Sequence, residues 1–340
     1  MKRCLTVFIA LVFWLPGGLV WGQPTGSFKE NLDQFIAEAL QNNPELREAE
    51  HKISASKEVP PQAGSLDDPV LKFELKNLPV NTFSFSQEAM TQKQVTITQK
   101  FPFPGKLGLK TEMAKKDVEI AEENYEEIKL RIVREVKRSY YELSFIMAAI
   151  DIVKQNKELL QQFVTIAETK YSVGKGIQQD VLKAQVELSK ILDELIRLNK
   201  LRENEQARLN TLMNRLPQAP LSIPHGIAKT RFSYGIDDLQ RLAEQNRPFL
   251  KGIKSLIERF DRSYQLARKQ YYPDFNIGFR YGQRQNSLSA RHPDFVSGFI
   301  GINIPIWFKT KQARKAAEER HKLDMAREKY NSARNQVFLK

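Results

Sequence analysis

The chain has 340 residues and a single cysteine, Cys4, near its N-terminus, which excludes an intramolecular disulfide framework. Its formal net charge is +13, from 53 basic and 40 acidic residues. Because the basic residues are interleaved with Glu and Asp, as in 115–117 and 202–205, the charge pattern indicates solvated helix faces and argues against a patch that binds nucleic acid.

The first 22 residues have the composition of a secretory signal peptide. Lys2 and Arg3 give a basic start, residues 5–20 are mostly apolar, and Gly22 is small enough for a cleavage position. A membrane anchor is the alternative, but residues 16–18 interrupt an apolar run that is already short for a span. We expect a mature chain from about Gln23; taking the two basic residues of the leader from 53 leaves 51 against 40 acidic residues, a net of +11.

An internal repeat with an offset of about 204 residues relates the two halves of the chain. The matched residues of the first half are Leu32, Phe35, Ala39, Pro44 and Leu46, and their counterparts are Ile236, Leu239, Ala243, Pro248 and Leu250. Self-similarity of this extent marks duplicated architecture. The sequence therefore predicts a first structural repeat at 23–215, a linker at 216–234 and a second, incomplete repeat at 235–340.

Each repeat is expected to begin with a helix that is followed by two strands. The first helix is predicted over 31–59, with Pro60, Pro61 and the stretch 64–69 as its stop. Apolar and polar residues then alternate with a period of two at 70–76 and 94–101, and again at 275–281 and 296–304, which predicts four amphipathic strands. Four strands cannot close a membrane barrel, so several copies would have to share one, and three copies would give twelve strands.

Long helices are predicted in the first repeat. Apolar positions step by four and three from Ala114 to Ile132, within a helix at 106–170 that would be on the order of 95 Å long. The same stepping resumes from Ile177 to Leu198 after a glycine-containing turn. Two helices of coiled-coil period joined in this way predict an antiparallel hairpin. An ordinary bundle core is the alternative, but helices of this length exceed a compact domain and indicate a tube or stalk.

Several short motifs resemble the outer membrane efflux protein (TolC-like) family. They are Phe101 to Lys106 at the exit from the second strand, Tyr171 to Gly174 and Asp180 to Ala184 around the hairpin turn, and Asp67 to Pro69 before the first strand. The resemblance implies an α+β membrane protein with long antiparallel helical hairpins, located in the outer membrane with a periplasmic helical portion. It also implies a homotrimer with a shared twelve-stranded β-barrel in outer membrane lipid, whose tips meet a periplasmic adaptor protein linked to an inner membrane pump.

The hairpin turn and the polar strand residues are the candidate sites. By resemblance, the adaptor-binding tip would comprise Tyr171, Gly174, Lys175, Gly176, Ile177, Gln178 and Asp180. Its glycines would allow a tight turn with positive φ, and Asp180 is placed to cap the following helix. The residues expected to face the lumen of a barrel are Lys72, Glu74, Lys76, Thr96, Thr98, Asn276 and Arg280. A soluble sandwich with this polar face in solvent is the alternative.

The second repeat is expected to lack its tip hairpin. Pro305 matches Pro102 and Lys309 matches Lys106, so Lys340 corresponds to Lys137 and no counterpart of 138–216 follows in this sequence. The leading functional prediction is a passive exit duct of a tripartite export system. The alternatives are a periplasmic coiled-coil adaptor or structural stalk, and a truncated duct that does not function.

The sequence predicts neither an enzyme nor a bound metal or cofactor. The four histidines, His51, His225, His292 and His321, lie far apart without ligand-like spacing. Residues 174–176 are too short for a phosphate-binding loop and follow no predicted strand. No group of nucleophile, base and acid can be singled out, so a role in transport by shape and lining charge is expected.

Overall fold

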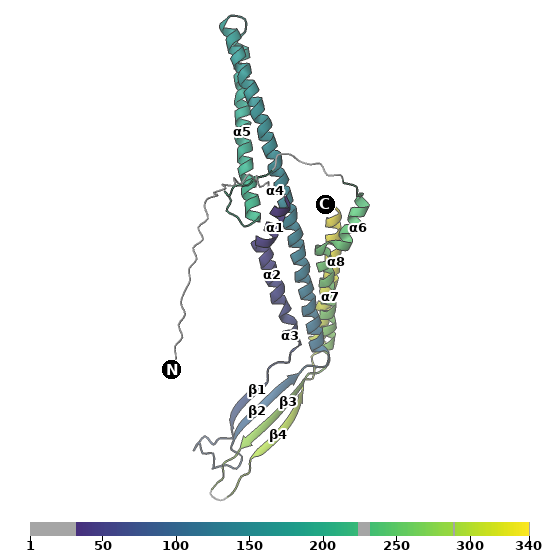
Figure 1. The fold of residues 1–340 in the computed structure, drawn as a ribbon. Coiled ribbons are helices and arrows are strands. Elements are labelled where there is room, and N and C mark those ends of the chain that lie inside the picture. The colour runs from purple at the N-terminus through teal and green to yellow at the C-terminus, as the bar shows by residue number, and fades with distance from the viewer. Residues whose placement is uncertain (1–31, 224–231, 288–289, 340) are drawn as a thin grey trace, which may run out of the picture.

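Long helices extend from one side of a small antiparallel sheet (Figure 1). The computed structural model describes residues 32–223, 232–287 and 290–339. The predicted signal peptide at 1–22 and part of the predicted linker, 224–231, lie outside the described residues. Within the described ranges, none of the helices combines the length and the apolar character that a passage through a lipid bilayer requires.

The N-terminal helical segment is divided into three helices, so the prediction of one continuous helix over 31–59 was wrong. These are α1 (Leu32–Asn42), α2 (Pro44–Lys57) and α3 (Val59–Gly64). Asn43 separates the first two: its side chain accepts a hydrogen bond from Glu45 N at 3.0 Å and donates one to Leu212 O at 2.9 Å. Pro60 and Pro61 do not stop the helical segment as predicted, because prolines are tolerated in the first turn of a helix and occupy that turn in α3. The segment ends at Gly64, where the second part of the predicted stop begins.

The predicted hairpin is formed by α4 (Lys106–Ser172) and α5 (Gln178–Leu212), which run antiparallel (Figure 1). With 67 residues, α4 is about 100 Å long. Near its middle, Ile132 and Val136 pack with Phe35 of α1 and Leu209 of α5 in the largest hydrophobic cluster. Further out, Ile146, Ile150 and Leu198 form a second cluster. Coiled-coil periodicity therefore does place an apolar stripe between the two helices.

The second repeat supplies α6 (Ile236–Asn246), α7 (Pro248–Lys269) and α8 (Gln312–Leu339). The break between α6 and α7 precedes Pro248, as the break between α1 and α2 precedes Pro44. Helix α7 packs along α4, and charged pairs line this contact, with Lys116 2.7 Å from Glu258 and Arg247 3.2 Å from Glu127. Helix α8 packs on the other side of α7.

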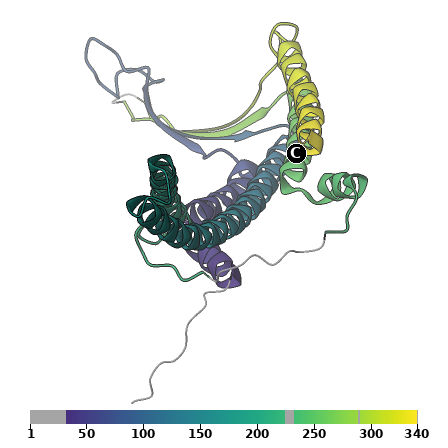
Figure 2. The same cartoon turned by 90° about the horizontal axis from the view of Figure 1, so that it is seen from above.

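The sheet contains β1 (Val70–Lys76), β2 (Gln92–Phe101), β3 (Phe275–Gln283) and β4 (Phe295–Ile302) in that order, with all neighbours antiparallel. The sheet thus joins the two repeats, because β2 of the first pairs with β3 of the second. Seen along the perpendicular view, the strands form a curved layer beside the helices (Figure 2). Strands β1 and β4 are the two edges within the described residues, with unpaired backbone groups along their outer sides.

Candidate functional site

One face of the sheet is polar, and the residues predicted to line a lumen lie on it. The register places Lys72 opposite Thr96 and Thr96 opposite Arg280 in one row. Directly opposed residues of antiparallel strands share a face, and residues two apart along a strand share it too. The rows before and after bring the remaining predicted residues to this same face: Glu74, Lys76, Thr98 and Asn276. Whether the face borders a lumen stays a prediction.

The middle of the polar face is more tightly packed than the alternation predicted. Gln94, only 5% exposed, donates to Gln92 Oε1 at 2.8 Å, and Arg280 Nε donates to Thr96 Oγ1 at 3.2 Å. The ring of Phe299 lies over Gly278, where an added Cβ would come within 2.1 Å of it. Gln92, Gln94 and Phe299 were not predicted as residues of the polar face, although the alternation with a period of two places them on it.

The opposite face of the sheet is apolar and exposed. Phe73 and Ile300 are each 72% exposed, and their neighbours on this face are also accessible: Leu71, Leu75, Ile97, Ile277, Phe279, Tyr281, Val296 and Ile302. A contiguous apolar surface of this kind marks contact with a membrane or with another protein. No described helix packs on the sheet, so the described residues leave this face uncovered.

At the junction of sheet and helices, Lys106 and Asp274 form a buried ion pair. Lys106 Nζ lies 2.7 Å from Asp274 Oδ1 and donates to Tyr272 O at 2.8 Å, while Phe103 N donates to the same carboxylate at 2.9 Å. Burial alone would raise the pKa of Asp274. The hydrogen bonds from Lys106 and Phe103 and the lysine charge outweigh it, so this pKa lies below its usual range. The pair ties the start of α4 to the start of β3.

The segment between β2 and α4 is held by further contacts to the second repeat. The rings of Phe103 and Tyr272 stack with centroids 4.6 Å apart. Gly105 has φ of +85° and precedes α4, and an added Cβ there would lie 2.8 Å from Lys269 Nζ. Lys269 in turn donates to Pro104 O at 3.3 Å. The motif at 101–106 therefore acts as a rigid connection between the sheet and the long helix.

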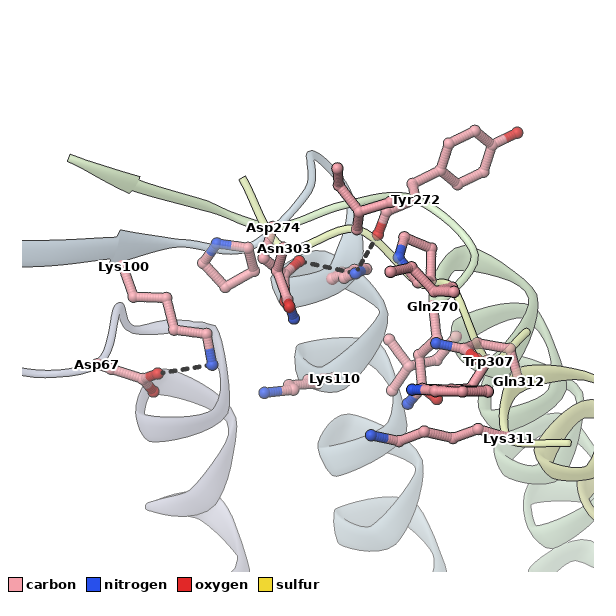
Figure 3. A pocket seen from close by; sticks show the side chains of 16 residues that line it. Asp67, Lys100, Lys110, Gln270, Tyr272, Asp274, Asn303, Trp307, Lys311 and Gln312 are labelled. Atoms are coloured by element: carbon pink, nitrogen blue, oxygen red, sulfur yellow. Dashed lines mark hydrogen bonds and ion pairs between the residues drawn. The ribbon is translucent and has the colours of Figure 1, made fainter. Parts of the chain in front are cut away.

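Beside this connection lies a cavity of about 570 Å³, which we call the junction cavity (Figure 3). Its walls come from the segments that precede β1, β3 and α8, from the beginning of α4, from the ends of β2 and α7, and from the segment that follows β4. Four lysines and two aspartates line it: Lys100, Lys106, Lys110, Lys311, Asp67 and Asp274. Local sequence patterns do not reveal this cavity, because its lining residues extend from Asp67 to Gln312, which is more than two thirds of the chain.

The predicted tip residues lie together in the turn between α4 and α5. Gly174 has φ of +74°, as predicted, and Lys175 N donates to Lys170 O at 2.8 Å. Tyr171 and Ile177 are exposed, at 49% and 59%, and so is Val173. The turn thus presents apolar side chains at the far end of the hairpin from the sheet (Figure 1).

Two details of the predicted tip were wrong. Positive φ occurs at Gly174 and not at Gly176, where an added Cβ would lie 3.1 Å from Lys170 Cβ, so close packing against the end of α4 favours glycine there. Asp180 does not cap α5, because the helix already begins at Gln178 with Ile177 as its cap residue. Asp180 lies in the first turn, where its negative charge still favours the helix dipole.

The hairpin also carries apolar side chains on its exposed surface. Along α4 they recur at Tyr141, Phe145, Ile152, Leu159, Phe163 and Ile166, and along α5 at Leu182, Val186 and Ile196. These positions are separate from the stripe that packs between the two helices. Exposed apolar residues at helical spacing indicate a further packing surface.

An amphipathic sheet at one end and a long antiparallel hairpin at the other define the α+β fold of outer membrane channel proteins. Residues 35–215, more than half of the chain, match the model of the family described as outer membrane efflux protein. The chain belongs to that family, which places it in the cell outer membrane with its helices in the periplasm.

Two curated relatives match part of this chain. The toxin and drug export protein A of Aggregatibacter actinomycetemcomitans is 24% identical over 202 residues, which cover 58% of this chain and 44% of the relative. An uncharacterized protein of Haemophilus influenzae is 20% identical over 200 residues, which again cover 58% of this chain and 44% of the relative. The chain therefore spans less than half of the length of these relatives.

Solved structures share the fold over most of the chain. The outer membrane protein VceC of Vibrio cholerae superposes with a TM-score of 0.73 at 20% identity, covering 90% of this chain and 75% of that one. The CmeC outer membrane channel of Campylobacter jejuni superposes with a TM-score of 0.71 at 15% identity, covering 93% of this chain and 72% of that one. At these identities the similarity establishes the fold, and the cargo and partners of those proteins do not transfer to this chain by similarity alone.

Proposed function

We propose that the chain is a subunit of an outer membrane exit duct, which passively conducts cargo delivered by a periplasmic adaptor and an inner membrane pump. The observation that carries this proposal is the presence in one chain of a sheet with an exposed apolar face and a helical hairpin whose longer helix, α4, is about 100 Å long. The first suits contact with lipid, and the second suits a tube that reaches into the periplasm.

The proposed duct is a homotrimer. Two open sheet edges per chain favour pairing between copies, because an unpaired edge in lipid leaves backbone groups without hydrogen bonds. Three copies would supply twelve strands, with the polar face around the lumen and the apolar face toward lipid. The exposed apolar residues of the hairpin would then pack against hairpins of neighbouring copies. The absence of an enzymatic role is part of the same proposal.

The proposed adaptor contact is the turn Tyr171–Asp180. Its exposed apolar side chains and its position at the end of the hairpin support docking of another protein there. The division into a signal peptide at 1–22, repeats at 23–215 and 235–340 and a linker at 216–234 belongs to the proposal as well. A relative is named a toxin and drug export protein, so such cargo is a candidate for this duct too.

A gel test of the outer membrane fraction addresses the duct directly. We expect this chain in that fraction, with a band of trimer size when the sample is unheated and of monomer size after heating. Reconstitution of the purified trimer into planar bilayers should give ion conductance. A soluble periplasmic monomer without conductance would contradict the proposal.

A coiled-coil adaptor or stalk would share the hairpin, but an amphipathic sheet has no function in such a protein. Detergent dependence separates the two functions. An exit duct requires detergent for extraction because its apolar sheet face is exposed to lipid, whereas a stalk would leave the membrane with high salt alone.

A further inference from the structure

The junction cavity has an excess of positive charge that the described residues do not neutralise. Four lysines and two aspartates line it, which gives a formal charge of +2. Lys106 is paired with Asp274, and Lys100 lies 3.5 Å from Asp67. The two remaining lysines, Lys110 and Lys311, have no carboxylate partner among the described residues. Figure 3 shows Lys100, Lys110 and Lys311 around the same recess.

Lys110 and Lys311 come from different parts of the chain. Lys110 lies in the second turn of α4, and Lys311 directly precedes α8. Both residues are exposed, so solvent reaches their side chains, but like charges on opposite walls of one recess still repel one another. Two uncompensated lysines in one recess therefore create a positive potential that favours entry of an anion.

A second observation at the cavity concerns Gln312. This residue lines the cavity and begins α8, and its Oε1 is buried without a hydrogen-bond partner. The two ends of a glutamine amide are assigned from their partners, so the opposite orientation would direct an N–H donor to this place. Helix α8 has 28 residues, and the N-terminus of such a helix also favours negative charge.

The cavity continues the polar face of the sheet. Lys100 pairs with Asn276 in the last row of that face, and Asn303, which follows β4, lines the cavity. The face itself carries Lys72, Lys76 and Arg280 but one acid, Glu74, within the described strands. Positive groups thus extend from the cavity along the surface that the proposed duct would turn to its lumen.

We propose that the junction cavity binds multivalent oxyanions, which are small solutes carrying two or more phosphate or carboxylate groups. Lys110 and Lys311 would contact the anion, Gln312 would donate to it, and Lys100 would be shared between the anion and Asp67. A cation would meet net repulsion here, and an apolar solute would leave the lysines without a partner. That these solutes are cargo rests on the proposed duct; binding itself does not, because one chain supplies every wall.

Calorimetric titration of inorganic pyrophosphate into the purified full chain, in neutral detergent at low salt, tests the site. The site variant is Lys110→Gln with Lys311→Gln. The matched control is Lys154→Gln with Lys183→Gln, two exposed lysines on α4 and α5 of the hairpin. The wild type and the control should bind alike, and each lysine removed from the cavity should weaken binding about tenfold, as for a lost hydrogen bond to a charged group.

No measurable binding by the wild type, or equal losses in the two double variants, would overturn the proposed site. A bilayer recording separates this result from the duct itself. Conductance without pyrophosphate binding would support the proposed duct and reject the anion site. Binding without conductance would support the anion site and reject the duct.

Discussion

At the scale of single residues, the ion pair of Lys106 and Asp274 links the two predicted repeats. Lys106→Met should destabilise the chain by about 2–3 kcal/mol, because it leaves a buried carboxylate without its cation. Urea unfolding followed by circular dichroism measures this loss. Lys100→Met is the control, since its pair with Asp67 is half exposed and should change stability by less than about 1 kcal/mol. Equal losses of stability in Lys106→Met and Lys100→Met would show that the stability of the junction does not depend on the pair of Lys106 and Asp274.

Glu319 gives the chain a pH dependence. It is 4% exposed on α8, where burial raises its pKa but hydrogen bonds from Ser263, Lys315 and Lys322 lower it to about 2. A carboxyl whose pKa is lower in the folded chain stabilises it above the ordinary value of 4.5, and this contribution is lost as the pH falls toward 2.

Glu319→Gln should accordingly flatten the stability curve across this range of pH. The measurement is the melting temperature of the helices at a series of pH values, compared with Glu318→Gln, whose side chain is half exposed. Identical curves for the wild type and Glu319→Gln would contradict the assignment.

At the scale of elements, the repeat predicts how β4 of one copy meets β1 of the next. The pair of β2 with β3 places Ile97 opposite Phe279. The repeat offset makes Leu75 of β1 the counterpart of Phe279. The counterpart of Ile97 in β4 is Ile300 when the two sequences are matched, and Ile302 when the pairing partners within the two hairpins are matched. Both counterparts in β4 lie on the apolar face. Leu75 of one copy should therefore lie opposite Ile300 or Ile302 of its neighbour.

Cysteine pairs can measure this register. Leu75→Cys combined with Ile300→Cys or with Ile302→Cys should form a disulfide between copies, because opposed residues lie about 5 Å apart. Leu75→Cys with Gly301→Cys is the control, since Gly301 belongs to the polar face. A stronger cross-link in this control would mean that the two edges meet in the opposite phase.

At the scale of the whole molecule, the apolar sheet face should decide membrane insertion. Ile277→Lys places a charge on that face and should cost about 2–4 kcal/mol if it lies near the bilayer midplane. We expect less of this variant in the outer membrane fraction. Asn276→Lys, one residue away on the polar face, should insert normally. Equal amounts of the two variants in the membrane would argue against contact of this face with lipid.

The sequence determined the bounds of the four strands and of α4 to within about two residues, and it located α5, although the predicted stepping ended at Leu198 and the helix continues to Leu212. Alternation with a period of two and apolar stepping by three and four are properties of neighbouring residues, so they can be read without knowing the fold. The same local patterns placed the predicted lumen residues on one face of the sheet. The short motifs that resemble the family lie within 35–215 and were sufficient to predict it, and the match to the family model confirmed this prediction.

The tertiary structure decided what depends on distant contacts. Asn43 donates to the carbonyl of Leu212 across 169 residues, and Lys106 pairs with Asp274 across 168 residues. The cap of α5 and the packing of Gly176 depended on where the chain turned, which periodicity does not fix. The junction cavity exists because strand pairing brings both repeats together at one end of the sheet. Periodicity sets which face of an element is buried, whereas long-range packing sets what that face meets.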